Sequence, residues 1–182
     1  MPAIASLSAV RKISRVLSPL CLLVALAWPL VVAGSVIGGP ISALISTVGI
    51  HANETQVASI GLWQRVLCAG IGVLPALAYA GALLALADCL RGFAAGDYFG
   101  LRCVLGLRRF AGRSFVASLL GLIAQPLCSV VLSWHFGVGQ RQLALGLSSD
   151  QIGMLLLAGV VWTIAGVMSE ARRIADENAQ FV

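Results

Sequence analysis

Long apolar stretches dominate the chain, and four of them are long enough to cross a lipid bilayer. Charged residues are absent between Arg15 and Glu54, Arg65 and Asp88, Arg113 and Arg141, and Asp150 and Glu170. A bilayer core about 30 Å thick needs a helix of about 20 apolar residues. A charge inside such a span would cost about 2.5–3.5 kcal/mol. We therefore predict four membrane-spanning helices, at about residues 17–37, 66–90, 114–134 and 152–168.

The first charge-free stretch has room for two spans, but its sequence favours one. Gly38, Gly39 and Pro40 interrupt the helix after the first span. The next apolar run, 41–50, has only ten residues, which is too few to cross a bilayer. We expect a short interfacial or re-entrant segment there, followed by a polar loop at 51–56.

The composition supports the same class of protein. The chain has 182 residues, of which 59% are apolar and 10% charged, and its mean hydropathy is +0.98. Soluble domains carry about 25% charged residues, so neither a soluble globule nor a disordered chain fits. The predicted fold class is all-α: a polytopic, four-transmembrane-helix bundle that forms a single membrane domain over residues 1–182.

Basic residues gather in three segments that four spans would place on one side of the membrane. The segments are the tail 1–16, the loop 91–113 and the tail 169–182, which together hold ten of the twelve Lys and Arg residues. Arg65 and Arg141 fall on the other side. The positive-inside rule therefore predicts that both termini are cytoplasmic. Because such clusters set orientation and contact anionic lipids, we expect no direct nucleic-acid partner.

The N-terminal tail 1–16 has two interpretations that the residues leave open. Apolar residues recur there at steps of three, interleaved with Arg11, Lys12 and Arg15. This pattern is typical of an amphipathic helix on the lipid surface, and also of a basic anchor for the first span. The apolar run exceeds the about 7–15 residues of a signal-peptide core, so we expect the first span to be retained.

Few residues offer chemistry within the spans. Asp88 is the only acid near a membrane core, and Gln125 lies inside the third span, so the two are candidates for an intramembrane polar site. The alternative for Asp88 is a helix-end ion pair with Arg91, three residues later. The sequence contains no catalytic triad pattern, phosphate-binding loop or Gly-rich nucleotide motif. We therefore predict no catalytic residue and no enzymatic activity.

The cysteines and histidines do not form a ligand pattern. Five cysteines occur without a CxxC spacing, which argues against a zinc site or a disulfide framework. His51 and His135 fall on the outer side, and we expect no carboxylate or second His to support either one as a ligand. We expect no metal and no other cofactor, with a haem between the two histidines as a further alternative.

Two cytoplasmic segments have an amphipathic pattern that suits protein docking. In the 91–113 loop, aromatic and apolar residues alternate with arginines, and in the 169–182 tail an apolar line follows helix-spaced ion pairs. The predicted docking residues are Tyr98, Phe99, Arg102, Arg108, Arg109, Ile174 and Phe181. Small residues such as Gly34 and Gly38 allow close helix packing, either within the bundle or in a homo-oligomer.

Two motifs carry a resemblance to a known family. They are Phe-Ala-Ala-Gly-Asp-Tyr-Phe between the second and third spans, and Glu-Ala-Arg-Arg-Ile-Ala-Asp-Glu-Asn-Ala-Gln-Phe-Val at the end. With the four-span topology over about residues 15–182, they resemble the bacterial membrane family called domain of unknown function 2975. The resemblance implies a bacterial inner-membrane location and a small helix-turn-helix regulator as a neighbouring partner. It supplies no catalytic residue.

These observations leave two classes of function open. The first is a non-enzymatic regulatory or sensory protein whose cytoplasmic segments bind a soluble partner. The alternative is a subunit of a membrane transport or redox complex, in which Asp88, Gln125 and the two proline-containing middle spans surround a polar path. Four spans with one acid make a poor path alone, so this alternative requires an oligomer.

Overall fold

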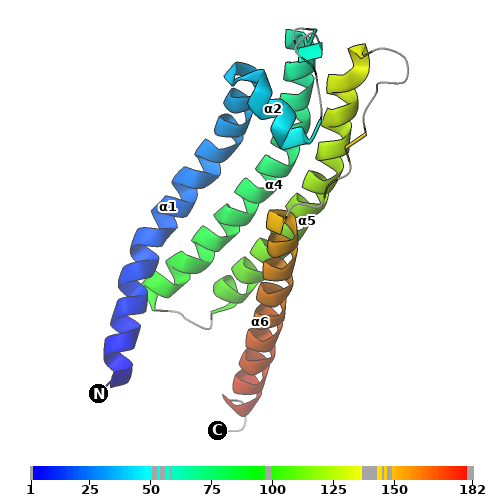
Figure 1. The fold of residues 1–182 in the computed structure, drawn as a ribbon. Coiled ribbons are helices and arrows are strands. Elements are labelled where there is room, and N and C mark those ends of the chain that lie inside the picture. The colour runs from blue at the N-terminus through cyan, green and yellow to red at the C-terminus, as the bar shows by residue number, and fades with distance from the viewer. Residues whose placement is uncertain are drawn as a thin grey trace.

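A computed structural model describes residues 2–50, 53, 56–57, 59–96, 100–136, 143–144, 146 and 149–179, and their regular structure is entirely helical (Figure 1). The elements are α1 (Pro2–Gly38), α2 (Ile41–Val48), α4 (Leu62–Ala95), α5 (Leu101–Leu132), the 3-10 helix η1 (Ser133–His135) and α6 (Ser149–Ala179). Over this part of the chain, four segments are long and apolar enough to cross a membrane: Arg11–Gly38, Leu62–Ala95, Leu101–His135 and Ser149–Ile174. The prediction of an all-helical chain with four apolar spans is confirmed.

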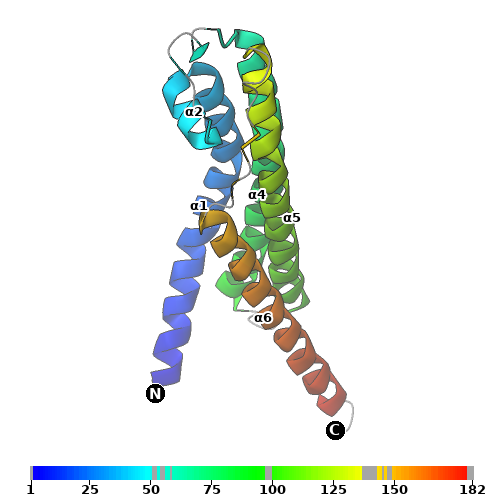
Figure 2. The same cartoon turned by 45° about the vertical axis from the view of Figure 1, so that its right-hand side comes forward.

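The four long helices pack in chain order as an open row. α4 lies between α1 and α5, and α6 packs against α5. Among the described residues, α1 and α6 share no extensive interface, and Figures 1 and 2 show them diverging toward the end that carries both termini. The row therefore does not close into a ring in which the first and last helices meet. The connection between α4 and α5 lies at this same end (Figure 1).

The predicted break after the first span is present. α1 ends at Gly38, and Pro40 has extended backbone with φ −64° and ψ 136° before α2 begins. A Cβ atom on Gly39 would lie 2.2 Å from the carbonyl oxygen of Ser35, so a larger residue does not fit at this turn. The short segment expected after the break is the two-turn helix α2, which ends at Gly49 with φ 78°.

The helices extend well past the predicted spans and include most of the predicted 91–113 loop. α4 continues to Ala95, and α5 already begins at Leu101. Between them the chain turns at Gly96, whose φ of 90° is a conformation that glycine adopts without steric penalty. Apolar residues mark where a helix can sit in lipid, whereas Arg and Leu continue a helix outside it. The predicted amphipathic segment is thus the first part of α5 itself.

Small side chains fill the interfaces between helices, while large apolar side chains point outward. The most buried residues of α4 and α5 include Ala82, Ala87, Cys89, Cys103 and Ala111, each at most 1% exposed. By contrast, Leu30 on α1 is 74% exposed. In lipid, helices associate through close packing of small residues and not through burial of large apolar ones. The packing therefore agrees with helices that lie in a membrane.

The last helix begins halfway along the row (Figure 1). Near its start, the amide nitrogen of the Gln151 side chain lies 3.6 Å from the place of a Cβ atom on Gly121, in the middle of α5. The chain returns to this depth along α5, and the backbone N–H of Ala144 donates a hydrogen bond of 3.0 Å to the Ser129 hydroxyl. Non-helical backbone at membrane depth needs partners within the protein, and Ser129 provides one.

Candidate functional site

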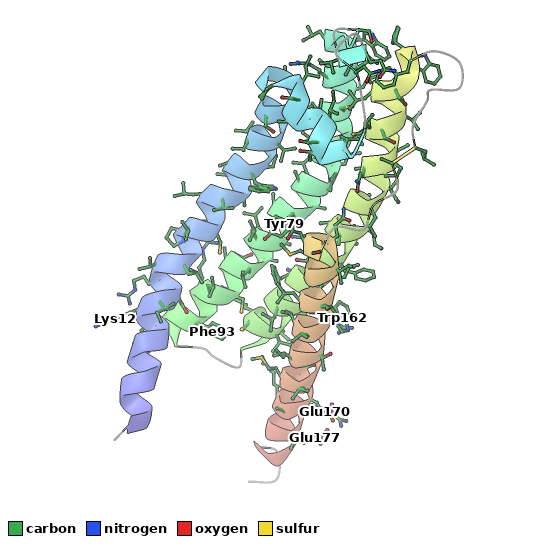
Figure 3. The ribbon with its side chains drawn as sticks, viewed as in Figure 1. Lys12, Tyr79, Phe93, Trp162, Glu170 and Glu177 are labelled. Atoms are coloured by element: carbon green, nitrogen blue, oxygen red, sulfur yellow. The ribbon has the colours of Figure 1, made fainter. Side chains whose placement is uncertain are left out.

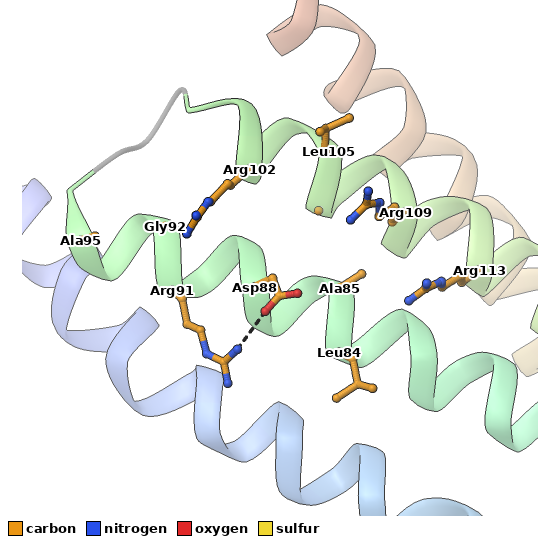
Figure 4. Close-up of a pocket in the computed structure, with 11 residues that line it drawn as sticks. Leu84, Ala85, Asp88, Arg91, Gly92, Ala95, Arg102, Leu105, Arg109 and Arg113 are labelled. Carbon is orange, nitrogen blue, oxygen red and sulfur yellow. Dashed lines mark hydrogen bonds and ion pairs between the residues drawn. The ribbon is translucent and has the colours of Figure 1, made fainter.

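A groove lined by charged side chains runs between α4 and α5 near the connection that joins them (Figure 4). Its α4 wall is formed by Leu84, Asp88, Arg91 and Ala95. These residues are separated by four, three and four positions, a spacing that places them on one face of a helix. The groove encloses about 710 Å³, which is within the range of small-ligand sites.

Three arginines form the facing wall. Arg102, Arg109 and Arg113 lie on one face of α5, at steps of seven and four residues, and their side chains extend toward α4 (Figure 4). We call the space between these three residues and the α4 wall the arginine groove. The structure thus brings together Asp88, Arg102 and Arg109, which the sequence predicts in two separate candidate sites.

Close approach of the two backbones forms the floor of the arginine groove. A Cβ atom on Gly106 would lie 2.9 Å from the carbonyl oxygen of Ala85 and 3.0 Å from the Cβ of Cys89. Beside this contact, the sulfur atoms of Cys89 and Cys103 are 2.7 Å apart, and both side chains are fully buried. Gly106 therefore allows the helices to approach until charged side chains on both can line one space.

The charges in the arginine groove are unbalanced. Arg91 Nη1 lies 2.8 Å from Asp88 Oδ1, which is the helix-end ion pair expected from their spacing. Arg113 Nη1 donates a hydrogen bond of 2.6 Å to the carbonyl oxygen of Gly81. Arg102 and Arg109 have no ion-pair or hydrogen-bond partner among the described residues. Within the described residues, the four arginines of the groove therefore exceed its one carboxylate by three positive charges.

Arg108 takes a different role from its neighbour Arg109. Its guanidinium carbon lies 4.9 Å from the centre of the Trp162 ring of α6, in cation–π geometry. Gly112, one turn further along α5, also faces the Trp162 ring. Among the predicted docking residues, Arg108 therefore joins α5 to α6 instead of lining the groove.

The predicted cytoplasmic tail is a straight continuation of α6. Glu170 and Glu177 lie on the part of α6 that carries the C-terminal end of the chain (Figure 3), and both pair with Arg173, at 2.5 Å and 3.6 Å. Ile174 is 49% exposed. Three other predicted docking residues, Tyr98, Phe99 and Phe181, lie outside the described residues.

Gln125 does not lie near Asp88. Its side-chain nitrogen donates a hydrogen bond of 3.4 Å to the carbonyl oxygen of Val48 at the end of α2, and Gly146 of the returning segment lies beside it. At 1.5 Å per residue, Gln125 is about 28 Å along α5 from Gly106 on the floor of the arginine groove. Its contacts hold α2 and the returning segment against α5.

The histidines show no ligand geometry in the described part of the chain. The His135 ring packs edge-on against the Trp63 ring, with centroids 5.6 Å apart. His51 lies outside the described residues. No group of three or more His, Cys, Asp or Glu side chains among the described residues is placed to hold a metal ion.

Three residues that matter in the structure were not among the predicted site residues. Arg91 and Arg113 complete the arginine groove, and the spacing of Arg102, Arg109 and Arg113 at steps of seven and four residues is the sequence signal that places the three on one helix face. Gln64 is fully buried at the other end of α4. Its side chain accepts a bond of 2.8 Å from the Gly61 N–H and donates one of 2.9 Å to the Val131 carbonyl oxygen. No sequence motif indicates these hydrogen bonds of Gln64.

Comparisons of the chain with protein-family models, curated proteins and solved structures found no match.

Proposed function

We propose that this chain is a non-enzymatic, multi-pass protein of the bacterial inner membrane that acts as a regulatory or sensory partner of a soluble cytoplasmic protein. The observation that carries the proposal is the continuation of α6 beyond its apolar part. Residues 169–179 stay helical, carry the Glu170–Arg173–Glu177 ion pairs, and leave Ile174 half exposed. A helix with charged flanks and an uncovered apolar position suits docking into a groove of a partner.

The distribution of basic residues supports a cytoplasmic position for this end. α1 starts, α4 meets α5, and α6 finishes at the same end of the row (Figure 1). At the other end, Arg65 donates hydrogen bonds of 2.9 Å and 3.3 Å to the carbonyl oxygens of Ile37 and Gly39. Arg65 therefore caps the C-terminal end of α1. Because most basic residues lie at the opposite end of the row, the positive-inside rule favours that end as cytoplasmic.

The distance between Asp88 and Gln125 favours a regulatory protein over a transport or redox subunit. A polar path would bring the two side chains to one lumen, but Asp88 of α4 lines the arginine groove, whereas Gln125 of α5 bonds to Val48 at the far end of the row. The partner class that we propose is a helix-turn-helix regulator, on the family resemblance of the loop and tail motifs. Self-association through the exposed outer faces of the row is compatible with this role.

A photo-crosslinking amino acid at Ile174 tests the proposal. The matched control is the same residue at Val167, two turns earlier on the same face of α6, which is 66% exposed. We expect crosslinks in intact cells from position 174 to a soluble DNA-binding protein, and crosslinks from position 167 to lipid alone. Reporter fusions after residues 100 and 182 would show both positions in the cytoplasm. Crosslinks from position 174 to lipid or to the same chain alone would contradict the proposal.

A further inference from the structure

The excess positive charge of the arginine groove favours the binding of an anion. Among the described residues, Asp88 is the one acid that lines the groove, and its carboxylate pairs with Arg91 at 2.8 Å. Arg102, Arg109 and Arg113 face the same space, so each raises the electrostatic energy of the others. An intramembrane or interfacial cluster of like charges is stable when a counter-ion of suitable shape neutralises it. Guanidinium groups are well matched to phosphate oxygens, which they bind in pairs of hydrogen bonds.

The position of the groove along the helices and the apolar residues that line it indicate which kind of anion would fit. The hydrogen bond of Arg113 to Gly81 lies about 15 Å along α4 from Arg91, well inside the apolar part of the helix. Leu84 and Leu105, each about two-fifths exposed, form apolar walls beside the charges. A ligand that fills this space therefore carries negative charge at one end and apolar groups next to it.

We propose that the arginine groove is a binding site for phosphate groups, and that the headgroup of an anionic phospholipid supplies them. The phosphates would lie between Arg102 and Arg109, while the acyl chains follow Leu84 and Leu105 toward the apolar part of the row. A lipid with two phosphates, such as cardiolipin, fits three unbalanced arginines better than a lipid with one. The site is independent of the soluble partner proposed for α6.

Adjacent arginines on α5 give a matched test. Arg102→Gln and Arg109→Gln each remove one groove charge, and neither side chain has a partner among the described residues whose loss would unfold the chain. Arg108→Gln removes the same charge from the next position, but that side chain lies over Trp162. Thermal stability without added lipid checks that all variants fold.

The measurement is binding by the full-length protein in neutral phosphatidylcholine nanodiscs that contain a small fraction of cardiolipin. Native mass spectrometry would count the lipids that stay bound after release, and titration would give their affinity. We expect the unchanged protein and Arg108→Gln to retain cardiolipin equally. Because one surface arginine contributes about a fivefold change in affinity for an anionic membrane, each groove variant should bind about fivefold more weakly. The Arg102→Gln/Arg109→Gln double variant should bind about 25-fold more weakly.

A parallel titration with inorganic pyrophosphate separates lipid from a soluble source. If pyrophosphate stabilises the protein, the groove variants abolish this effect and cardiolipin binding is absent, then the phosphate site stands and its lipid source is refuted. If neither ligand binds, or if Arg108→Gln weakens binding as much as Arg109→Gln does, the arginine groove is not a phosphate site.

Discussion

Gly106→Ala tests whether close backbone approach builds the arginine groove. The added methyl group would lie 2.9 Å from the carbonyl oxygen of Ala85, 3.0 Å from the Cβ of Cys89 and 3.3 Å from its backbone nitrogen. The 2.9 Å contact is shorter than real Cβ atoms show, the other two are tight, and none of the three atoms can move away by side-chain rotation. The α4 and α5 helices must therefore separate by a few tenths of an ångström along their contact.

Two opposing effects determine how much Gly106→Ala changes the free energy of unfolding. Overpacking in a tight core costs about 1–3 kcal/mol, whereas alanine is favoured over glycine in a helix by about 1 kcal/mol. The matched control is Gly70→Ala on α4, where the new methyl group meets no atom within 4 Å, so only the second effect acts. We expect Gly106→Ala to be less stable than Gly70→Ala by about 1–3 kcal/mol.

The assay is reversible unfolding of each variant in mixed micelles, followed by helix content, with the thermal midpoint as a second reading. At about 2–4 °C per kcal/mol for a chain of this size, the midpoints should differ by about 2–12 °C. Equal stability of the two variants would refute the argument that Gly106 is needed for close packing. A Gly70→Ala variant less stable than Gly106→Ala would also contradict it, since the predicted difference in stability would then have the opposite sign.

Three further substitutions have defined expectations. Gln64→Leu should lower the free energy of unfolding by about 1–3 kcal/mol, since it removes the hydrogen bonds of the Gln64 side chain to the Gly61 N–H and the Val131 carbonyl, and chemical unfolding in micelles would measure it. Asp88→Asn should change stability by no more than about 1 kcal/mol, because its pair with Arg91 is exposed; a collapse of yield would contradict this. Ser129→Ala should speed hydrogen exchange at Ala144 about tenfold, and unchanged exchange would show that the returning segment has another anchor.

The sequence predicts the number and approximate place of the spans because a charge in lipid is costly and its absence is easy to read. The break at Gly39 and Pro40 is equally local, since proline fixes φ and lacks a backbone N–H, whereas glycine adopts conformations that other residues avoid. The hydrophobic pattern does not predict where α4 ends or where α5 begins. Apolar periodicity ends near Leu90, but the helix continues to Ala95 because nothing before Gly96 stops it.

The candidate site was predicted only in pieces. Ion pairs at i,i+3 spacing depend on one helix, so the pair of Asp88 and Arg91 could be predicted. The arginine groove depends on the register between two helices, which the Gly106 contact with Ala85 sets. Register between helices follows from the shape of many side chains together and leaves no mark in either segment alone. The same limit applies to Gln64, because its partner Val131 on α5 lies 67 residues away in the chain.

Because α6 begins halfway along the row, its C-terminal part can swing like a lever arm about its contact with α5. Trp162 contacts Arg108 and Gly112 of α5 near the middle of α6, and Ala165, three residues further, is 1% exposed. From Trp162 to Ala179 the helix is about 25 Å long. A tilt of about 10° at this fulcrum would move the tip by about 4 Å, which is enough to make or break a contact with a bound protein. Arg108 contacts Trp162 while its neighbour Arg109 lines the arginine groove, so the same turn of α5 carries both the contact with α6 and one wall of the groove.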